Sequence, residues 1–439
     1  MTQDDGRAGN MGATEQGHQE PGLLKNSLWM ISGQGVAIGF QAIYFILIGR
    51  TLGSREYGVF VGAASLIQIL ANFSSVGMEM VMVRDVSRDR STFPSAWGAS
   101  LLVTMCGFVA VSILALILGH LLLSPSVLIL IPYVCISDAL FAKIVLLGSR
   151  AFQGFSRLAY TARLTALANA ARAVAAAGLF LFAKHLHTHP SAYDWTRIYW
   201  ISSLFMGVIS FWLVTKELGW PRFRLPTKLE LADGFSFSLS NSSISIYNDI
   251  DKTYLVSLGQ VQAAGIYSAA YRIVDVASSP LYGIYAAAFP RFFQEGAKSV
   301  RAAADLSYRL LKRTAIYGVL AAAAMFASAP ILPVMLGKSF SHSVDALRWL
   351  CFLPLIRCFH YAWGTTITGS SPQWIRTLTQ IGAALFNLAL NAMLIPRWSW
   401  QGAAVASLAT DGALAVSNWL VVTILLSREE SRKKESLLV

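Results

Sequence analysis

Charged residues are scarce in this chain: Asp, Glu, Lys and Arg make up only 13% of its 439 residues, against roughly 25% in ordinary soluble domains. Long polar stretches are scarce as well, and the mean hydropathy is +0.53. A soluble multidomain protein would need polar faces that the recurring apolar runs lack. The composition therefore predicts a polytopic helical membrane protein.

Cysteine and catalytic motifs are also sparse. The four cysteines all lie within apolar runs, where they act as small apolar residues, and their spacing fits neither a disulfide framework nor a zinc site. The stretch "GQGVAIG" lies inside an apolar run with no strand before it, so it favours helix packing over dinucleotide binding. No nucleotide-binding loop or catalytic triad pattern is present. We expect a protein that is not an enzyme and has no metal site or cofactor.

Apolar runs long enough to cross a bilayer recur along the whole chain. The first follows about 27 polar residues, carries no charge and has no small-residue cleavage site after it, so we expect a retained helix. We expect twelve spans: 28–48, 57–78, 97–123, 127–149, 164–183, 198–215, 234–258, 263–289, 314–336, 346–369, 377–396 and 401–426.

The net charge of +12 is distributed unevenly between the loops. With a cytoplasmic amino terminus, the cytoplasmic segments carry 23 Lys and Arg residues and the opposite segments carry six. This asymmetry follows the positive-inside rule and predicts that both termini are cytoplasmic. The basic balance then reports membrane topology and contact with anionic lipids, and not binding to nucleic acid.

A weak internal repeat divides the chain into halves. "TLGSREYGVF" resembles "SLGQVQAAGIY", and each joins the first two spans of a six-span set. An even number of spans separates them, so we expect two six-helix lobes, 28–215 and 234–426, related by pseudo-two-fold symmetry about the membrane normal. A disordered cytoplasmic leader (1–27), a linker (216–233) and a basic cytoplasmic tail (427–439) complete the predicted organisation. Residues 291–313 fit either an amphipathic helix on the membrane surface or a basic solvated loop.

Eleven ionisable residues fall inside the predicted spans. Each would cost roughly 2.5–3.5 kcal/mol at a helix centre facing lipid, so most must face a protein interior or a wet cavity. On span 234–258 a polar stripe includes Asp249 and Lys252, which are spaced i, i+3 and can pair, whereas Asp251 points the other way. Arg272 and Asp275 repeat the same spacing on the next span. Any single pair could instead serve only to hold helices together.

A cavity with excess cations suits an anionic substrate, because Arg and Lys bind phosphate through charge-assisted hydrogen bonds. Lys252 and Arg272 are the strongest candidates for substrate contact. The full set of candidate substrate-binding residues is Lys252, Arg272, Arg172, Arg357, Lys143, Gln34 and Gln41. The candidates for orienting these cations or coupling ions are Asp249, Asp251, Asp275 and Asp138.

Several stretches carry a resemblance to a known family. They are "IGRTLGSREYGVF", its echo "SLGQVQAAGIYSAAYR", the polar "NDIDK", "AAAFPRF" and "NAMLIPRWSWQGAAVAS". In this order and spacing the chain resembles the Wzx-type polysaccharide and O-antigen flippase branch of the multidrug/oligosaccharidyl-lipid/polysaccharide (MOP) exporter superfamily. The resemblance implies an all-α membrane fold of twelve helices in two MATE-like lobes. It also implies alternating access driven by an ion gradient, proton or sodium.

The resemblance implies a function in surface-polysaccharide biosynthesis. The chain would translocate undecaprenyl-diphosphate-linked oligosaccharide across the bacterial inner membrane, for O-antigen, capsule or exopolysaccharide. The expected partners are that glycan lipid, the membrane lipids and polysaccharide polymerase machinery. Two alternatives stay open: a cation-coupled multidrug exporter, whose usual first-helix carboxylate is missing here, and a membrane polysaccharide polymerase or ligase, for which the loops opposite the cytoplasm are short.

Overall fold

The computed structural model describes residues 23–438, so most of the predicted leader lies outside the described residues. The described chain is helical and contains no β-strand. Its elements are α1 (Leu23–Ala71), α2 (Met78–Arg88), η1 (Arg90–Thr92), α3 (Phe93–Leu122), α4 (Pro125–Leu128), α5 (Ile131–Val134), η2 (Cys135–Phe141), α6 (Ala142–Gly154), α7 (Leu158–Leu186), α8 (Ala192–Leu218), α9 (Lys228–Ser257), α10 (Val261–Lys298), α11 (Val300–Ser328), α12 (Ile331–Leu336), η3 (Lys338–Phe340), α13 (Ser343–Leu350), α14 (Leu353–Ser370) and α15 (Gln373–Leu438).

Two of these helices are each a pair of membrane crossings joined at a kink. α1 turns at Gly53 (φ 71°) and α15 turns at Ser399 (φ 53°), and both positions have left-handed backbone. The expected fourth span is broken into α4, α5, η2 and α6, of which η2 is a π-helix. Counted by crossings, the elements match the twelve expected spans. Seven described segments are long and apolar enough to span a membrane by length and composition, including the doubled α1 and α15.

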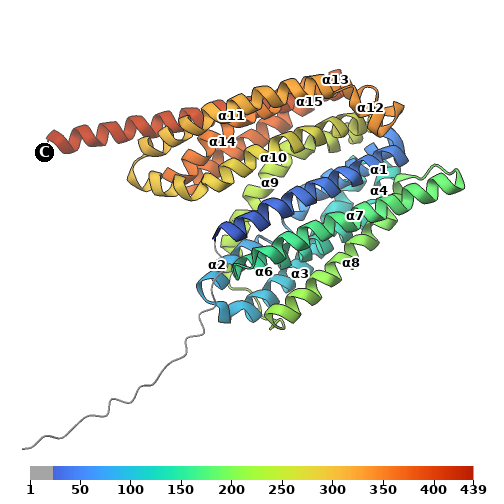
Figure 1. The fold of residues 1–439 in the computed structure, drawn as a ribbon, viewed down its shortest axis with the longest axis horizontal. Helices are drawn as coiled ribbons and strands as arrows, with labels where there is room; N and C mark the ends of the chain where they lie inside the picture. Colours follow the sequence, from blue (N-terminus) through green and yellow to red (C-terminus); the bar gives the residue numbers. More distant parts are fainter. Residues whose placement is uncertain (1–22, 439) are drawn as a thin grey trace, which may run out of the picture.

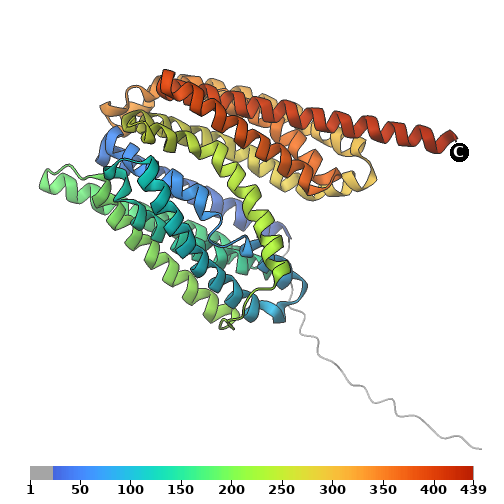
Figure 2. The ribbon, with the colours of Figure 1, turned by 180° about the vertical axis from the view of Figure 1, so that it is seen from behind.

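The crossings form two lobes (Figure 1). The N-lobe contains α1 to α8, and the C-lobe contains α9 to α15. α9 runs obliquely from the side of the N-lobe to the end where the lobes meet, as the view from behind also shows (Figure 2). The lobes touch at the end near the α1 kink. Toward α2 they diverge, except that α9 stays in contact with α1 and α2. The predicted architecture of two six-helix lobes is confirmed.

The joined end contains the two copies of the internal repeat. Gly58 from the first copy and Gly265 from the second lie against the opposite backbone. A Cβ on Gly58 would lie 1.8 Å from the Val261 carbonyl oxygen, and one on Gly265 would lie 1.9 Å from that of Ser54. Only glycine allows this approach, so the repeated sequence makes the seal between the lobes.

The serines of the α9 stripe mostly fasten α9 to α1. Ser238 donates its hydroxyl hydrogen to the Asn72 carbonyl (2.8 Å), and Ser242 donates to the Ile69 carbonyl (3.1 Å). Asn72 Nδ2 in turn donates to Ser245 Oγ (2.9 Å). The sequence leaves two possible surroundings for polar groups on this span, a protein interior and a wet cavity. The first half of the stripe lies in a helix contact, where carbonyl acceptors satisfy the hydroxyls.

Residues 291–313 form neither a surface-lying helix nor a loop. They continue α10 and open α11. The buried face of this part of α11 packs against α14: Ser307 donates to the Ala362 carbonyl (2.9 Å), and Ala303, Ala304 and Leu311 are buried beside it. The apolar face is therefore covered by the protein's own C-lobe. The predicted tail likewise continues α15 as helix up to Leu438.

Candidate functional site

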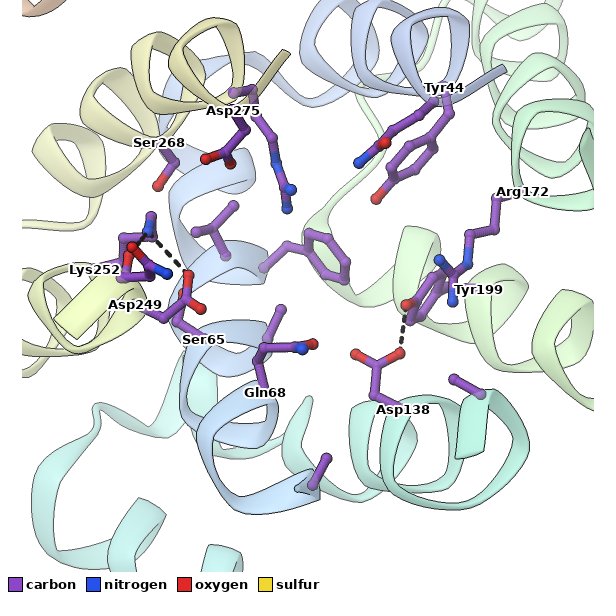
Figure 3. Close-up of a pocket in the computed structure, with 18 of the residues that line it drawn as sticks. Tyr44, Ser65, Gln68, Asp138, Arg172, Tyr199, Asp249, Lys252, Ser268 and Asp275 are labelled. Carbon is purple, nitrogen blue, oxygen red and sulfur yellow. Dashed lines mark hydrogen bonds and ion pairs between the residues drawn. The ribbon is translucent and has the colours of Figure 1, made fainter. Parts of the chain in front are cut away.

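A cavity of about 500 Å³ lies between the lobes, and we call it the central cavity. It is walled by both halves of α1, by η2, α6, α7 and α8 of the N-lobe, and by α9 and α10 of the C-lobe. Figure 3 shows acidic, basic and hydroxyl groups converging on it from these helices. Eight of the candidate site residues line it: Gln41, Asp138, Lys143, Arg172, Asp249, Lys252, Arg272 and Asp275.

On the N-lobe side, Asp138 lies in the π-helix η2. Its Oδ1 accepts a hydrogen bond from the Tyr199 hydroxyl at 2.5 Å. The Arg172 guanidinium lies 5.3 Å from the centre of the Tyr199 ring (Figure 3), which is within cation–π range. A π-helix turn redirects side chains locally and occurs often at functional sites. Here it places a carboxylate on the cavity wall, where Tyr199 contacts both Asp138 and Arg172.

On the C-lobe side, the Lys252 ammonium is almost fully engaged. Its Nζ lies 2.9 Å from Asp249 and 3.6 Å from Asp251, donates to the Asn248 carbonyl, and lies 4.3 Å from the centre of the Tyr271 ring. The pair expected between Asp249 and Lys252 is present. With two carboxylates beside it, Lys252 adds no positive charge for a ligand.

Asp251 has no place on the cavity wall. It is fully buried, and its Oδ2 accepts hydrogen bonds from Tyr267 (2.6 Å) and Ser407 (3.4 Å). It points away from the Asp249 side of α9, as the helical spacing predicts. The contact ties α9 to α10 and α15 inside the C-lobe.

Three cavity cations have no acidic partner. In the described part of the chain, no carboxylate oxygen lies within 4.0 Å of the charged nitrogens of Lys143, Arg172 or Arg272. Lys143 makes only a 3.5 Å hydrogen bond to Asn72. Two of these cations come from the N-lobe and one comes from α10 of the C-lobe, so their unpaired charge faces the cavity from both lobes.

The expected pair of Arg272 with Asp275 is wrong. Asp275 instead lies 3.6 Å from Arg357 of α14. Arg357 also contacts Asp411 (3.2 Å), Ser278 (3.2 Å) and the Tyr271 hydroxyl (2.7 Å). A partner from a neighbouring helix therefore replaces the one a turn away, and Arg272 stays unpaired.

Two further hollows adjoin the central cavity. Arg357 and Asp275 line a cavity of about 310 Å³ within the C-lobe, which we call the C-lobe cavity. Gln34 lines an apolar recess of about 220 Å³ between α1, α10 and α12, and Gln41, Arg272 and Asp275 line both this recess and the central cavity. Asp275 is thus on the wall of all three.

Sequence reasoning missed several polar residues on these walls. Tyrosines face the central cavity, where their rings resemble ordinary apolar packing in the sequence; they are Tyr44, Tyr57, Tyr199 and Tyr271. Arg376 was placed in a cytoplasmic loop, but it lies in the first turn of α15 and lines the C-lobe cavity with His360. The i, i+3 spacing of Arg357 and His360 and the i, i+4 spacing of Arg376 and Gln380 were the available signals.

The central cavity combines unpaired cations, amides and phenols in a space large enough for a polyanionic head group. Such groups can bind phosphate oxygens through charge-assisted hydrogen bonds from both lobes at once. Because the cations belong to separate lobes, one such ligand would contact both lobes.

Comparison with solved structures gives the fold of MOP transporters. An inward-facing multidrug resistance MATE family transporter of the MOP superfamily superposes with a TM-score of 0.72 at 16% identity, covering 92% of this chain and 99% of its own. An outward-facing conformation of such a transporter gives 0.64 at 15% identity, covering 93% and 96%. A MOP superfamily transporter from Pyrococcus furiosus Vc1, described as having a binding pocket of reverse polarity that suggests a different function, gives 0.63 at 16% identity, covering 92% and 95%.

Comparison at the sequence level is more specific. None of the curated proteins matches the chain. The profile of one family matches residues 23–295, which is more than half of the chain and includes the whole N-lobe and most of α10. With its MOP-type fold and its many apolar crossings, the chain belongs to the polysaccharide biosynthesis protein family and is a multi-pass membrane protein.

Proposed function

We propose that this protein is a flippase that carries undecaprenyl-diphosphate-linked oligosaccharide across the bacterial inner membrane by alternating access. The observation that carries the proposal is the set of three unpaired cations on the central cavity: Lys143, Arg172 and Arg272. Two phosphate groups would supply the negative charge that the cavity lacks. The family match to polysaccharide biosynthesis supports this choice of cargo.

The shape of the site supports a lipid-linked cargo. The apolar recess is lined by Ile38, Phe45, Val276 and Met335, and it joins the central cavity at Arg272. A polyprenyl chain could leave the cavity along this recess while the diphosphate stays on the cations. The fold also occurs in multidrug exporters, but an excess of cations would repel the cationic drugs that such a transporter carries.

The direction of transport follows from the charge asymmetry of the loops. The positive-inside rule favours a cytoplasmic location for the diverging end of the lobes, where α2 lies. In this conformation the protein would accept cargo from the cytoplasmic leaflet. Closing that end and opening the Gly58–Gly265 seal would release the cargo on the other side.

The test is transport of a fluorescent undecaprenyl-diphosphate oligosaccharide by the purified protein in proteoliposomes. We expect Arg172→Gln and Arg272→Gln each to lower the initial rate by about 10- to 100-fold, the effect of losing a charge-assisted hydrogen bond of roughly 1.5–3 kcal/mol. Arg309→Gln, an exposed arginine on α11, is the matched control and should transport normally. Runs with proton or sodium gradients would identify the coupling ion.

Two results would overturn the proposal. One is unchanged glycan-lipid transport by both cavity variants at equal reconstitution. The other is ethidium transport by the wild-type protein with no movement of the glycan lipid, which would identify a multidrug exporter.

A further inference from the structure

The C-lobe cavity is a second polar site that the diphosphate does not need. Its walls come from α9, α10, α14 and α15, and it shares Asn248 and Asp275 with the central cavity. A molecule whose phosphates lie on Arg172 and Arg272 would therefore have an adjoining chamber available for its next chemical group.

One of the two arginines of this cavity has no carboxylate partner among the described residues. Arg357 is neutralised by Asp411 at 3.2 Å and Asp275 at 3.6 Å. Arg376 donates from Nη1 to Thr368 Oγ1 at 2.6 Å, and no carboxylate among the described residues lies within ion-pair distance of its guanidinium. An arginine guanidinium has five N–H donors, so most of them remain available to a ligand.

Buried hydrogen-bond acceptors also point to a ligand. Asn418 Oδ1 and Asp411 Oδ1 accept no hydrogen bond within the described chain, although both residues are only 3% exposed. Asp411 Oδ1 lies 3.5 Å from His360 Nε2. They lie two turns apart on the same face of α15, and both line this cavity. An unsatisfied buried acceptor costs about 1–3 kcal/mol, which a ligand with hydroxyl donors would recover.

Aromatic side chains complete the lining. Tyr247, Tyr282 and Tyr361 border the cavity, and Tyr282 is 67% exposed although it is a large ring. Ring faces carry partial negative charge and attract weakly polarised C–H groups. Flat rings, buried oxygen acceptors and a guanidinium without a carboxylate partner among the described residues together match a polyhydroxylated ring that carries a carboxylate.

We propose that the C-lobe cavity is the glycan subsite and that it takes a sugar bearing a carboxylate, with Arg376 as the partner of that carboxylate. This inference rests on the proposed flippase function and adds the class of glycan. The sugar hydroxyls donate to Asn418 and Asp411, and the sugar ring lies against the tyrosines. A neutral sugar would leave the charge of Arg376 without a partner.

Binding to the full-length protein in lipid nanodiscs tests the inference with three probes. The first is a polyprenyl diphosphate linked to a disaccharide that contains glucuronic acid. The second has glucose in place of glucuronic acid, and the third is the polyprenyl diphosphate alone. We expect Arg376→Gln to weaken binding of the first probe by about tenfold or more, the effect of one charge-assisted hydrogen bond, and to leave the other two within about twofold.

Controls separate this inference from the proposed function. Arg272→Gln should weaken all three probes, because it removes a diphosphate contact, whereas Arg309→Gln should weaken none. Thr379→Trp, which fills the C-lobe cavity from α15, should weaken both glycan probes and spare the bare diphosphate. This second variant keeps the test decisive where Arg376→Gln fails to fold.

The inference is overturned if Arg376→Gln weakens the bare diphosphate as much as the acidic probe, because Arg376 would then serve the phosphates. It is also overturned if the acidic and neutral glycan probes lose affinity equally. The inference is likewise overturned if the Thr379→Trp variant binds both glycan probes as tightly as the wild type does. None of these results bears on Arg272 and the diphosphate site.

Discussion

Arg357 contacts four partners from two other helices, α10 and α15, and it is 5% exposed. The sequence predicts that a charge at this depth needs a partner, but it cannot say which one. The i, i+3 spacing of Arg272 and Asp275 identifies possible partners on the same helix, but not those that other helices supply. The tertiary fold brings α14 against α10, and Arg357 then competes for Asp275. Spacing within a helix predicted the Asp249–Lys252 pair correctly, because no cation other than Lys252 lies within 4.0 Å of the Asp249 carboxylate in the described part of the chain.

Replacing Arg357 with leucine should destabilise the protein strongly. The change leaves Asp411 as an uncompensated buried charge, and breaking a buried pair from one side costs about 3–5 kcal/mol. We expect a clear fall in the thermal unfolding temperature in detergent.

The double variant Arg357→Leu/Asp411→Leu provides the control. With both charges removed, much of the lost stability should return, because a buried ion pair and an apolar pair of similar volume are often equivalent. A double variant less stable than Arg357→Leu alone would mean that Asp411 does not depend on Arg357.

At the scale of elements, α9 begins with a well-defined cap. Thr227 and Glu230 form a reciprocal capping box, and Arg224 donates to both Glu230 carboxylate oxygens, at 2.9 and 2.5 Å. The hydrogen bonds from Arg224 and then those from Thr227 lower the pKa of Glu230 from 4.5 to about 2, against the opposing effect of burial. The cap anchors the start of α9 next to the linker.

This cap predicts a pH dependence. Because the pKa of Glu230 is lower in the folded state, its contribution to stability is complete above about pH 4.5 and is lost as the pH falls toward 2. Glu230→Gln keeps the hydrogen bond to the Thr227 N–H but removes the charge. We expect the variant to lose less stability than the wild type between pH 5 and pH 3 in thermal unfolding. Parallel curves for the two proteins would rule out this role for Glu230.

Elements also show where sequence reasoning stopped. The apolar runs predicted the twelve crossings, because a helix that crosses a bilayer needs about 20 mainly apolar residues. They did not give the π-helix at Cys135–Phe141 or the left-handed residue Ser399, since no local signal marks either. The amphipathic pattern of residues 291–313 predicts that their apolar face is buried. It does not show whether lipid or another helix of the protein buries this face, and in the structure α14 does.

At the scale of the whole molecule, the two lobes are held together at one end by contacts between segments far apart in the chain. Ser54 N donates to Ser339 Oγ at 3.2 Å, and Arg50 donates to the Val334 carbonyl at 2.9 Å. Both contacts join α1 of the N-lobe to the segment around α12 of the C-lobe. The alternating access that we propose requires that they separate in each cycle.

A cross-link at this end should stop transport. We expect Ser54→Cys/Ser339→Cys to form a disulfide on oxidation with copper phenanthroline, to lose most glycan-lipid transport, and to regain it with dithiothreitol. The single variants, treated alike, control for the four native cysteines, of which Cys106 is exposed. Full transport by the cross-linked protein would show that this end does not open.

The close approach of Gly58 and Gly265 has a mechanical consequence. The gate at that point consists of peptide groups pressed against each other, without an ion pair to be broken. The separation of these peptide groups should therefore depend little on ionic strength. A higher salt concentration should screen the attraction between the anionic cargo and the cavity cations, and so slow cargo binding, while the rate of the opening motion stays almost unchanged.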